Sequence, residues 1–334
     1  MSKKSKRKSE VKASILVLLL IAILLIASTY AWFTANKTVT ISTLDVNVAA
    51  QNGLQISTDG TTWKSIITKE DITKGYTGHT NQLPTTMEPV STIGEIGTDA
   101  KAGKMKMFYG TVLPNKTTGK SELTAVEESE AAGASGKFIA FDIFLKVDAP
   151  TDLNLSADSN VIVKEGTTDR GLQNAARVAF CVEGSEPAGT SVDTITALKG
   201  AVSFGEPNST TYIWEPNSDV HTAAAVSNAK DTYGITTAQG PNEDAVEYYG
   251  VKQKIDTGIE LINTNNGTDT TNFTKITPNY ITKKVMQDTK VFKLEAGITK
   301  VRVYMWVEGQ DVDCENSASG SDIAFNVQFT VANT

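Results

Sequence analysis

The chain has 334 residues, of which 40% are hydrophobic and 21% are charged. This composition is typical of a globular protein, and the length allows one large domain or two modest ones. The formal net charge is −7 at pH 7 although the first residues are basic, so the remainder is more acidic still. An acidic body argues against nucleic acid or anionic lipid as a partner.

The N-terminus combines a basic cluster, Lys3–Lys12, with the charge-free apolar run Ile15–Ala27. The run is shorter than the ~20 apolar residues of a membrane helix and suits the centre of a secretory signal. Cleavage after Ala31 would put Thr29 at the −3 position, whereas extending the uncharged segment to Phe33 would allow a retained anchor. We therefore expect a hydrophobic helix over residues 1–31, either signal peptide or transmembrane anchor, before an extracellular domain over residues 32–334.

Two blocks near this site carry a resemblance to a known family. Thr29–Thr34 reads Thr-Tyr-Ala-Trp-Phe-Thr, and Ser42–Val46 reads Ser-Thr-Leu-Asp-Val. Together they resemble the start of TasA/camelysin-type proteins, which Gram-positive bacteria export and process with a dedicated signal peptidase. Ser28 and Ser42 stand where glycine is usual in that family. The resemblance covers the N-terminal region only.

The resemblance implies a secreted, cell-surface subunit of a biofilm fibre. It further implies that a segment exposed by cleavage, here about Trp32–Val48, completes the sheet of a neighbouring subunit. The composition of residues 38–48 itself predicts a strand whose apolar positions change phase midway, which indicates a bulge or two shorter strands. The candidate donor-strand residues are Val39, Ile41, Leu44, Val46 and Val48.

Farther along the chain, strands alternate with long polar connections. Residues 53–66 predict a hairpin that turns at Asp59-Gly60, and residues 105–113 predict a strand. Loop insertions are expected at about 68–104, 115–137 and 184–280, where glycine, threonine and proline interrupt any period.

The strongest alternation of apolar and polar residues lies in residues 138–147, 176–182, 301–307 and 323–331. A short helical turn at residues 172–175 precedes the second of these strands. The predicted fold is all-β, a jelly-roll-like β-sandwich with long loops. The predicted core positions include Phe141, Ile143, Val303, Met305, Phe325, Val327 and Phe329.

Catalytic signatures are missing from the sequence. Its two histidines, His79 and His221, lie in polar surroundings, with no zinc, nucleophile-elbow or redox motif around them. The acidic stretch Glu308, Asp311 and Asp313 could hold Ca²⁺, which takes six to eight oxygen ligands. Alternatively, Glu215 and Asp311 cap turns or pair with Arg177 and Arg302, which lie among apolar neighbours. We predict no enzymatic activity and no cofactor beyond this calcium alternative.

The two cysteines, Cys181 and Cys314, lie far apart in the sequence. In an oxidising compartment they could form one disulfide, or they could remain separate buried thiols. Taken together, these features of the sequence best match a structural protein, which associates with itself into fibres after the membrane-bound precursor is cleaved. The alternatives are a membrane-anchored module that binds carbohydrate through Trp63, Trp214 or Tyr212, and a secreted protease suggested by the camelysin resemblance.

Overall fold

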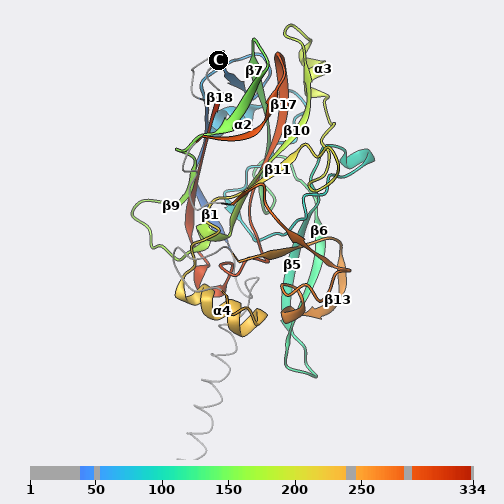
Figure 1. Ribbon diagram of the computed structural model, residues 1–334, viewed down its shortest axis with the longest axis vertical. Coiled ribbons are helices and arrows are strands. Elements are labelled where there is room, and N and C mark those ends of the chain that lie inside the picture. The colour runs from blue at the N-terminus through green and yellow to red at the C-terminus, as the bar shows by residue number, and fades with distance from the viewer. Residues whose placement is uncertain (1–37, 49–52, 238–245, 282–287, 332–334) are drawn as a thin grey trace, which may run out of the picture.

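The computed structural model describes residues 38–48, 53–237, 246–281 and 288–331, and its main body is a sandwich of two β-sheets (Figure 1). The first sheet has seven strands. In spatial order they are β16 (Thr289–Leu294), β8 (Thr151–Leu155), β18 (Asp322–Val331), β1 (Val39–Val48) and β3 (Ile66–Ile67), with β4 (Thr86–Met87) beside β1 and β9 (Asn160–Val163) beside β18.

The second sheet of the sandwich has six strands. Their spatial order is β15 (Tyr280–Ile281), β11 (Thr211–Glu215), β10 (Ala176–Glu186), β17 (Gly297–Val307), β7 (Ile139–Val147) and β2 (Gln55–Ser57). Most neighbours run antiparallel, but β1 pairs with β18 in parallel, and so does β11 with β15. The all-β prediction is confirmed.

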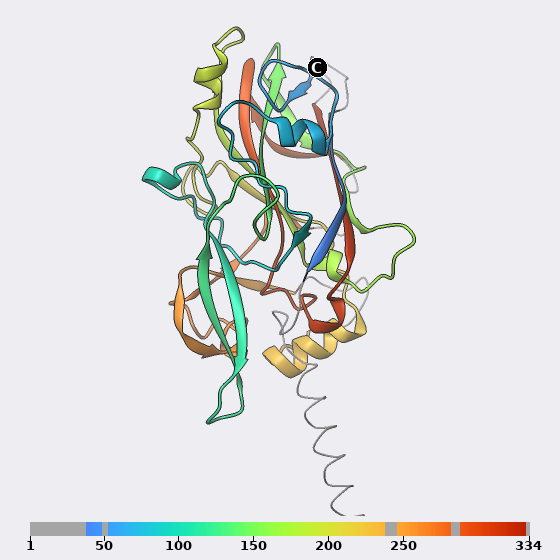
Figure 2. The same ribbon diagram turned by 180° about the vertical axis from the view of Figure 1, so that it is seen from behind.

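A smaller lobe lies at one end of the sandwich, where both views place β5, β6, β13 and α4 (Figures 1 and 2). Its sheets are β13 (Ile255–Glu260), β6 (Ser121–Glu128) and β5 (Met107–Pro114), and the pair β12 (Tyr248–Val251) and β14 (Phe273–Ile276). Across both parts of the molecule, the helices of the described residues are α2 (Lys69–Lys74), α3 (Val192–Thr196) and α4 (Ala223–Tyr233). The short 3-10 turns are η2 (Asp99–Lys101), η3 (Leu172–Ala175), η4 (Leu261–Asn263) and η5 (Asn316–Ala318).

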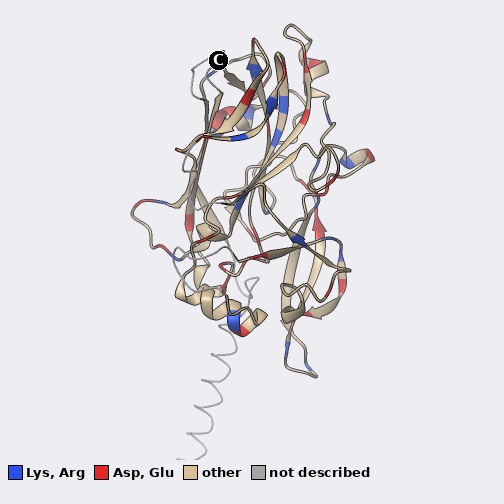
Figure 3. Cartoon of the chain, viewed as in Figure 1, with Lys and Arg blue, Asp and Glu red and all other residues tan. Residues whose placement is uncertain are grey.

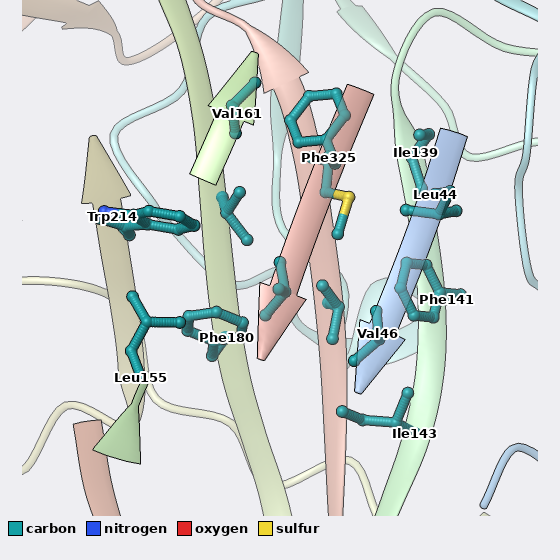
Figure 4. Packing of buried hydrophobic residues seen from close by; sticks show 14 of the residues in the cluster. Leu44, Val46, Ile139, Phe141, Ile143, Leu155, Val161, Phe180, Trp214 and Phe325 are labelled. Atoms are coloured by element: carbon teal, nitrogen blue, oxygen red, sulfur yellow. The ribbon is translucent and has the colours of Figure 1, made fainter. Parts of the chain in front are cut away.

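The sandwich core follows the predicted alternation. Along β18 every second side chain is buried, because successive residues of a strand point to opposite faces. Figure 4 shows Leu44 and Val46 of β1 beside Ile139, Phe141 and Ile143 of β7, so the two sheets share one core. Every core position named from the sequence is buried. The short helical turn predicted at residues 172–175 is also confirmed, and it is a 3-10 turn.

Two loop expectations are wrong in part. The insertion expected at 115–137 contains β6, whose sequence looks polar because only Leu123 and Ala125 enter the core of the small lobe. The region 184–280 contains α4, which buries Ala225, Ala229 and Tyr233. Small alanine side chains make a weak apolar stripe, so the helical period is hard to see in the sequence.

The N-terminal predictions lie outside the described residues. These are the helix over residues 1–31 and the processing site at Thr29 and Ala31. Within the part of the chain that the structure does describe, helices are all too short or too polar to span a bilayer.

Candidate functional site

The parallel seam between β1 and β18 is the candidate site. It runs from the pair Thr40–Asp322 to the pair Val48–Phe329, with a shift of register between Ile41 and Thr43. An inserted residue moves the following side chains to the opposite face, so the bulge brings both apolar phases of β1 to the same side. All candidate donor-strand residues therefore face the core, namely Val39, Ile41, Leu44, Val46 and Val48.

The other edge of β1 is held only near its ends. β4 pairs with Val39 and Thr40, and β3 pairs with Val46 and Asn47. No strand pair of the described residues reaches Leu44 on this side. β1 is therefore held mainly by β18 and by its own core side chains, and residues 49–54 alone connect it to the next strand, β2.

Withdrawal of β1 would leave a specific vacancy. The backbone of β18 would lose its parallel partner along most of its length, and an exposed strand edge is a template for another strand. The vacated core positions would form an apolar slot, and each Val, Leu or Ile that fills it contributes roughly 1.5–3 kcal/mol through burial. Such a slot would accept a segment with the same spacing of apolar residues and the same bulge as β1.

The acidic stretch after β17 forms a buried network rather than a calcium site. The Arg177 guanidinium, fully buried, donates through Nη2 to both Glu215 and Asp311. His221 Nδ1 lies 2.7 Å from Asp313 Oδ2, and Trp306 Nε1 donates to Glu308 Oε2 at 3.0 Å. The described residues contain no group of three or more His, Cys, Asp or Glu suited to a metal ion.

The calcium expectation for Glu308, Asp311 and Asp313 is therefore wrong, because each carboxylate is turned towards a different protein partner. The alternative with Arg177 is confirmed. Arg302 takes other partners than expected: its Nη1 donates to Asp142 Oδ1 at 2.7 Å, and its Nη2 donates to Glu130 Oε2 at 2.8 Å.

The buried network should make stability depend on pH. Burial raises the pKa of Glu215, Glu308 and Asp313 to about 7 each. A carboxyl with a folded pKa above its unfolded value stabilises the fold most when protonated, and this contribution is lost as pH rises from about 4 through about 7. We expect a higher unfolding temperature at about pH 5.5 than at about pH 7.5. Calorimetry at both pH values measures this, and a higher unfolding temperature at the upper pH would contradict it.

The two cysteines are not joined by a disulfide, and they are buried in different parts of the interior. Cys314 belongs to the sandwich core, whereas Cys181 points to the opposite face of the second sheet. The two thiols are thus on separate sides of the sheet, and the disulfide expected as one alternative is not formed.

The aromatic residues considered for carbohydrate binding are mostly not at the surface. Trp214 is fully buried, and Tyr212 stacks on Phe292 with ring centroids 5.5 Å apart. Trp63 is half-buried beneath the Lys146 ammonium, 5.4 Å from its ring centroid. A row of exposed stacking platforms is therefore not present among these three residues.

Comparison with protein-family models, with curated proteins and with solved structures finds no match to this chain. The class that the fold defines is an all-β sandwich whose first described strand lies parallel to its last.

Proposed function

We propose that this protein is an exported cell-surface structural protein whose subunits join into an extracellular fibre by strand addition. In this proposal the leader is removed by a signal peptidase, and the N-terminal segment of one subunit completes the sheet of the next. The TasA/camelysin-like blocks at Thr29–Thr34 and Ser42–Val46 support export and processing. The protein works through assembly and performs no catalysis.

The observation that carries the proposal is the β1–β18 seam. β1 lies between β18 on one side and the two short strands β3 and β4 on the other. Its apolar side chains have the spacing that its bulge sets. Strand addition uses these two features, because backbone hydrogen bonds give affinity and side-chain pockets give specificity. A strand that fills the slot of its own subunit yields a monomer, whereas one that fills the next subunit's slot yields a head-to-tail polymer.

Parallel pairing also suits an exchangeable strand. Antiparallel neighbours can be joined by a tight hairpin, but a parallel neighbour cannot. The partner of β1 is β18, at the far end of the described chain, so no turn between the two strands has to be broken when β1 leaves. The connection through residues 49–54 remains intact while the strand moves to a neighbour.

Deletion of Trp32–Val48 from the processed protein is expected to leave a domain that is strongly destabilised, because five core side chains are lost, and that no longer forms fibres visible by electron microscopy. The reason is that this change removes the donor strand and keeps the acceptor slot. A matched control deletes Asn115–Lys120 at the tip of the β5–β6 hairpin, remote from the seam in sequence and in pairing, and it should leave fibres unchanged.

A synthetic Thr38–Val48 peptide should bind the truncated domain and raise its unfolding temperature. A control peptide with Ser in place of Val46 and Leu44 should bind more weakly. Fibres from the truncated protein would contradict strand addition through β1. An intact processed protein that stays monomeric under all conditions would contradict the fibre function itself.

A further inference from the structure

A polar cavity of about 210 Å³ lies on the face of the second sheet that points away from the sandwich core. Its floor is formed by side chains from β7, β10 and β17, and its rim by Gly78, by residues 100–104 and by Lys199. Charged residues lie along these strands as well as on the loops (Figure 3). The cavity is separate from the β1–β18 seam, whose strands belong to the other sheet.

Most charges of the floor are neutralised within the protein. Arg302 pairs with Asp142 and Glu130, and Glu130 also lies 3.1 Å from the Lys104 ammonium. Lys300 Nζ donates to the carbonyl oxygens of Thr196 at 2.7 Å and Leu198 at 3.0 Å. These groups hold the walls together.

Glu183 on β10 is different. Its side chain is 2% exposed, and Oε2 accepts a hydrogen bond from the Ala201 amide at 3.2 Å. Oε1 is buried and has no hydrogen-bond partner among the described residues. A buried polar atom left in this state costs about 1–3 kcal/mol. Gly103 lies against this carboxyl group at the edge of the cavity, since a Cβ built there would be 2.8 Å from Oε2 and 3.0 Å from Oε1.

Lys199 provides the complementary feature at the rim. Its side chain is exposed, and within the described ranges it makes no salt bridge. The cavity therefore has a buried carboxyl oxygen without a donor at its floor and an ammonium without a counterion at its mouth. Lys104 and Arg302 are paired with Glu130 and Asp142, and Lys300 Nζ lies 3.5 Å from Asp142 Oδ2, so a ligand with a large net charge would be disfavoured.

We propose that this cavity binds a small zwitterion of amino-acid size, with the ligand's ammonium on Glu183 and its carboxylate on Lys199. The ammonium supplies the donor that Oε1 lacks, and the carboxylate supplies the counterion of Lys199. The volume is sufficient, because an engineered cavity of about 150 Å³ already holds benzene. Burial raises the pKa of Glu183 to about 7, so binding of an ammonium is tighter above this pH, where the carboxylate is ionised.

Isothermal titration calorimetry of the full chain with L-alanine and L-glutamine tests the proposal. Propionate and ethylamine, each with one of the two charges, serve as matched ligands. We expect at least one amino acid to bind at least about tenfold more tightly than either singly charged compound, and more tightly at pH 8 than at pH 6. Equal affinity for propionate or ethylamine, or no binding of either amino acid at about 10 mM, would overturn the proposal.

Substitutions at Glu183 and Lys199 test which residue binds the ammonium and which binds the carboxylate of the ligand. Glu183→Gln and Lys199→Ala should each weaken amino-acid binding about tenfold or more, and Glu183→Gln should also remove the pH dependence. Lys116→Ala, a change at another exposed lysine, is the control and should bind like the unchanged protein. Because Lys199 is exposed, its variant keeps the test decisive even if Glu183→Gln fails to fold. Unchanged affinity in the folded Lys199→Ala protein would overturn the assignment.

Discussion

Replacement of Val327 by aspartate is expected to unfold the sandwich. Val327 lies in the middle of β18, is fully inaccessible to solvent, and pairs with Val46 of β1. An unpaired carboxylate at this position loses its hydration without gaining a partner, which costs several kcal/mol. A domain of this kind is stable by only about 5–15 kcal/mol, so one such change removes a large part of the total.

Circular dichroism and thermal unfolding measure the effect. The matched control is Gln328→Asp, which introduces the same charge one residue farther along β18, on the half-exposed outer face. We expect the control to stay within about 1 kcal/mol of the unchanged protein. Equal stability of the two variants would contradict the assignment of faces along β18, and with it the position of the seam.

Replacement of Arg177 by methionine should have the second large effect, a loss of about 3–5 kcal/mol in the free energy of unfolding. Arg177 is fully buried, and its Nη1 also donates to the carbonyl oxygens of Asn174 at 3.2 Å and Ala176 at 3.0 Å. Without the guanidinium, Glu215 and Asp311 remain buried with no cation between them. Urea unfolding at neutral pH gives the magnitude.

The control for this change is Arg170→Met. Arg170 is exposed, and among the described residues it makes one long hydrogen bond of 3.4 Å to the Ser317 carbonyl, so its loss should cost no more than about 0.5 kcal/mol. The deficit of Arg177→Met should shrink at about pH 5, because burial raises the pKa of Glu215 to about 7 and this carboxyl group is then protonated. A deficit that is the same for both arginines would show that the buried pair contributes nothing.

The alternation of apolar and polar residues was sufficient to predict a strand where only one face of that strand packs against the core. Alternation in residues 323–331 predicted β18. The phase change within residues 38–48 predicted a bulge or two shorter strands, and the structure has one strand with a bulge. The sequence also predicted the turn Leu172–Ala175 before β10. These features depend on neighbours a few residues apart, and side-chain direction along a strand is set by its own backbone.

The pattern was misleading where both faces of a strand are buried. All of β17, Gly297–Val307, is buried, although only alternate residues are strongly apolar. Lys300 and Arg302 are accommodated because Asp142 and Glu130 arrive from elsewhere in the chain. Lys300 looks like a solvent-facing residue in the sequence until its partner is known, whereas Arg302 was expected to pair with a carboxylate and only the identity of that carboxylate was missed.

Only the tertiary structure decided which of the sequence-based alternatives holds. Arg177 and Asp311 are 134 positions apart, and Arg302 and Glu130 are 172 positions apart, so no local pattern could decide which of these charges meet. The same is true of the β1–β18 seam and of the cavity around Glu183. Residue types and the alternation of apolar and polar residues determined which segments become strands and which of their side chains are buried in the core. The choice of strand neighbours, and therefore of partners for buried charges, depends on long-range packing that forms only when the whole chain folds.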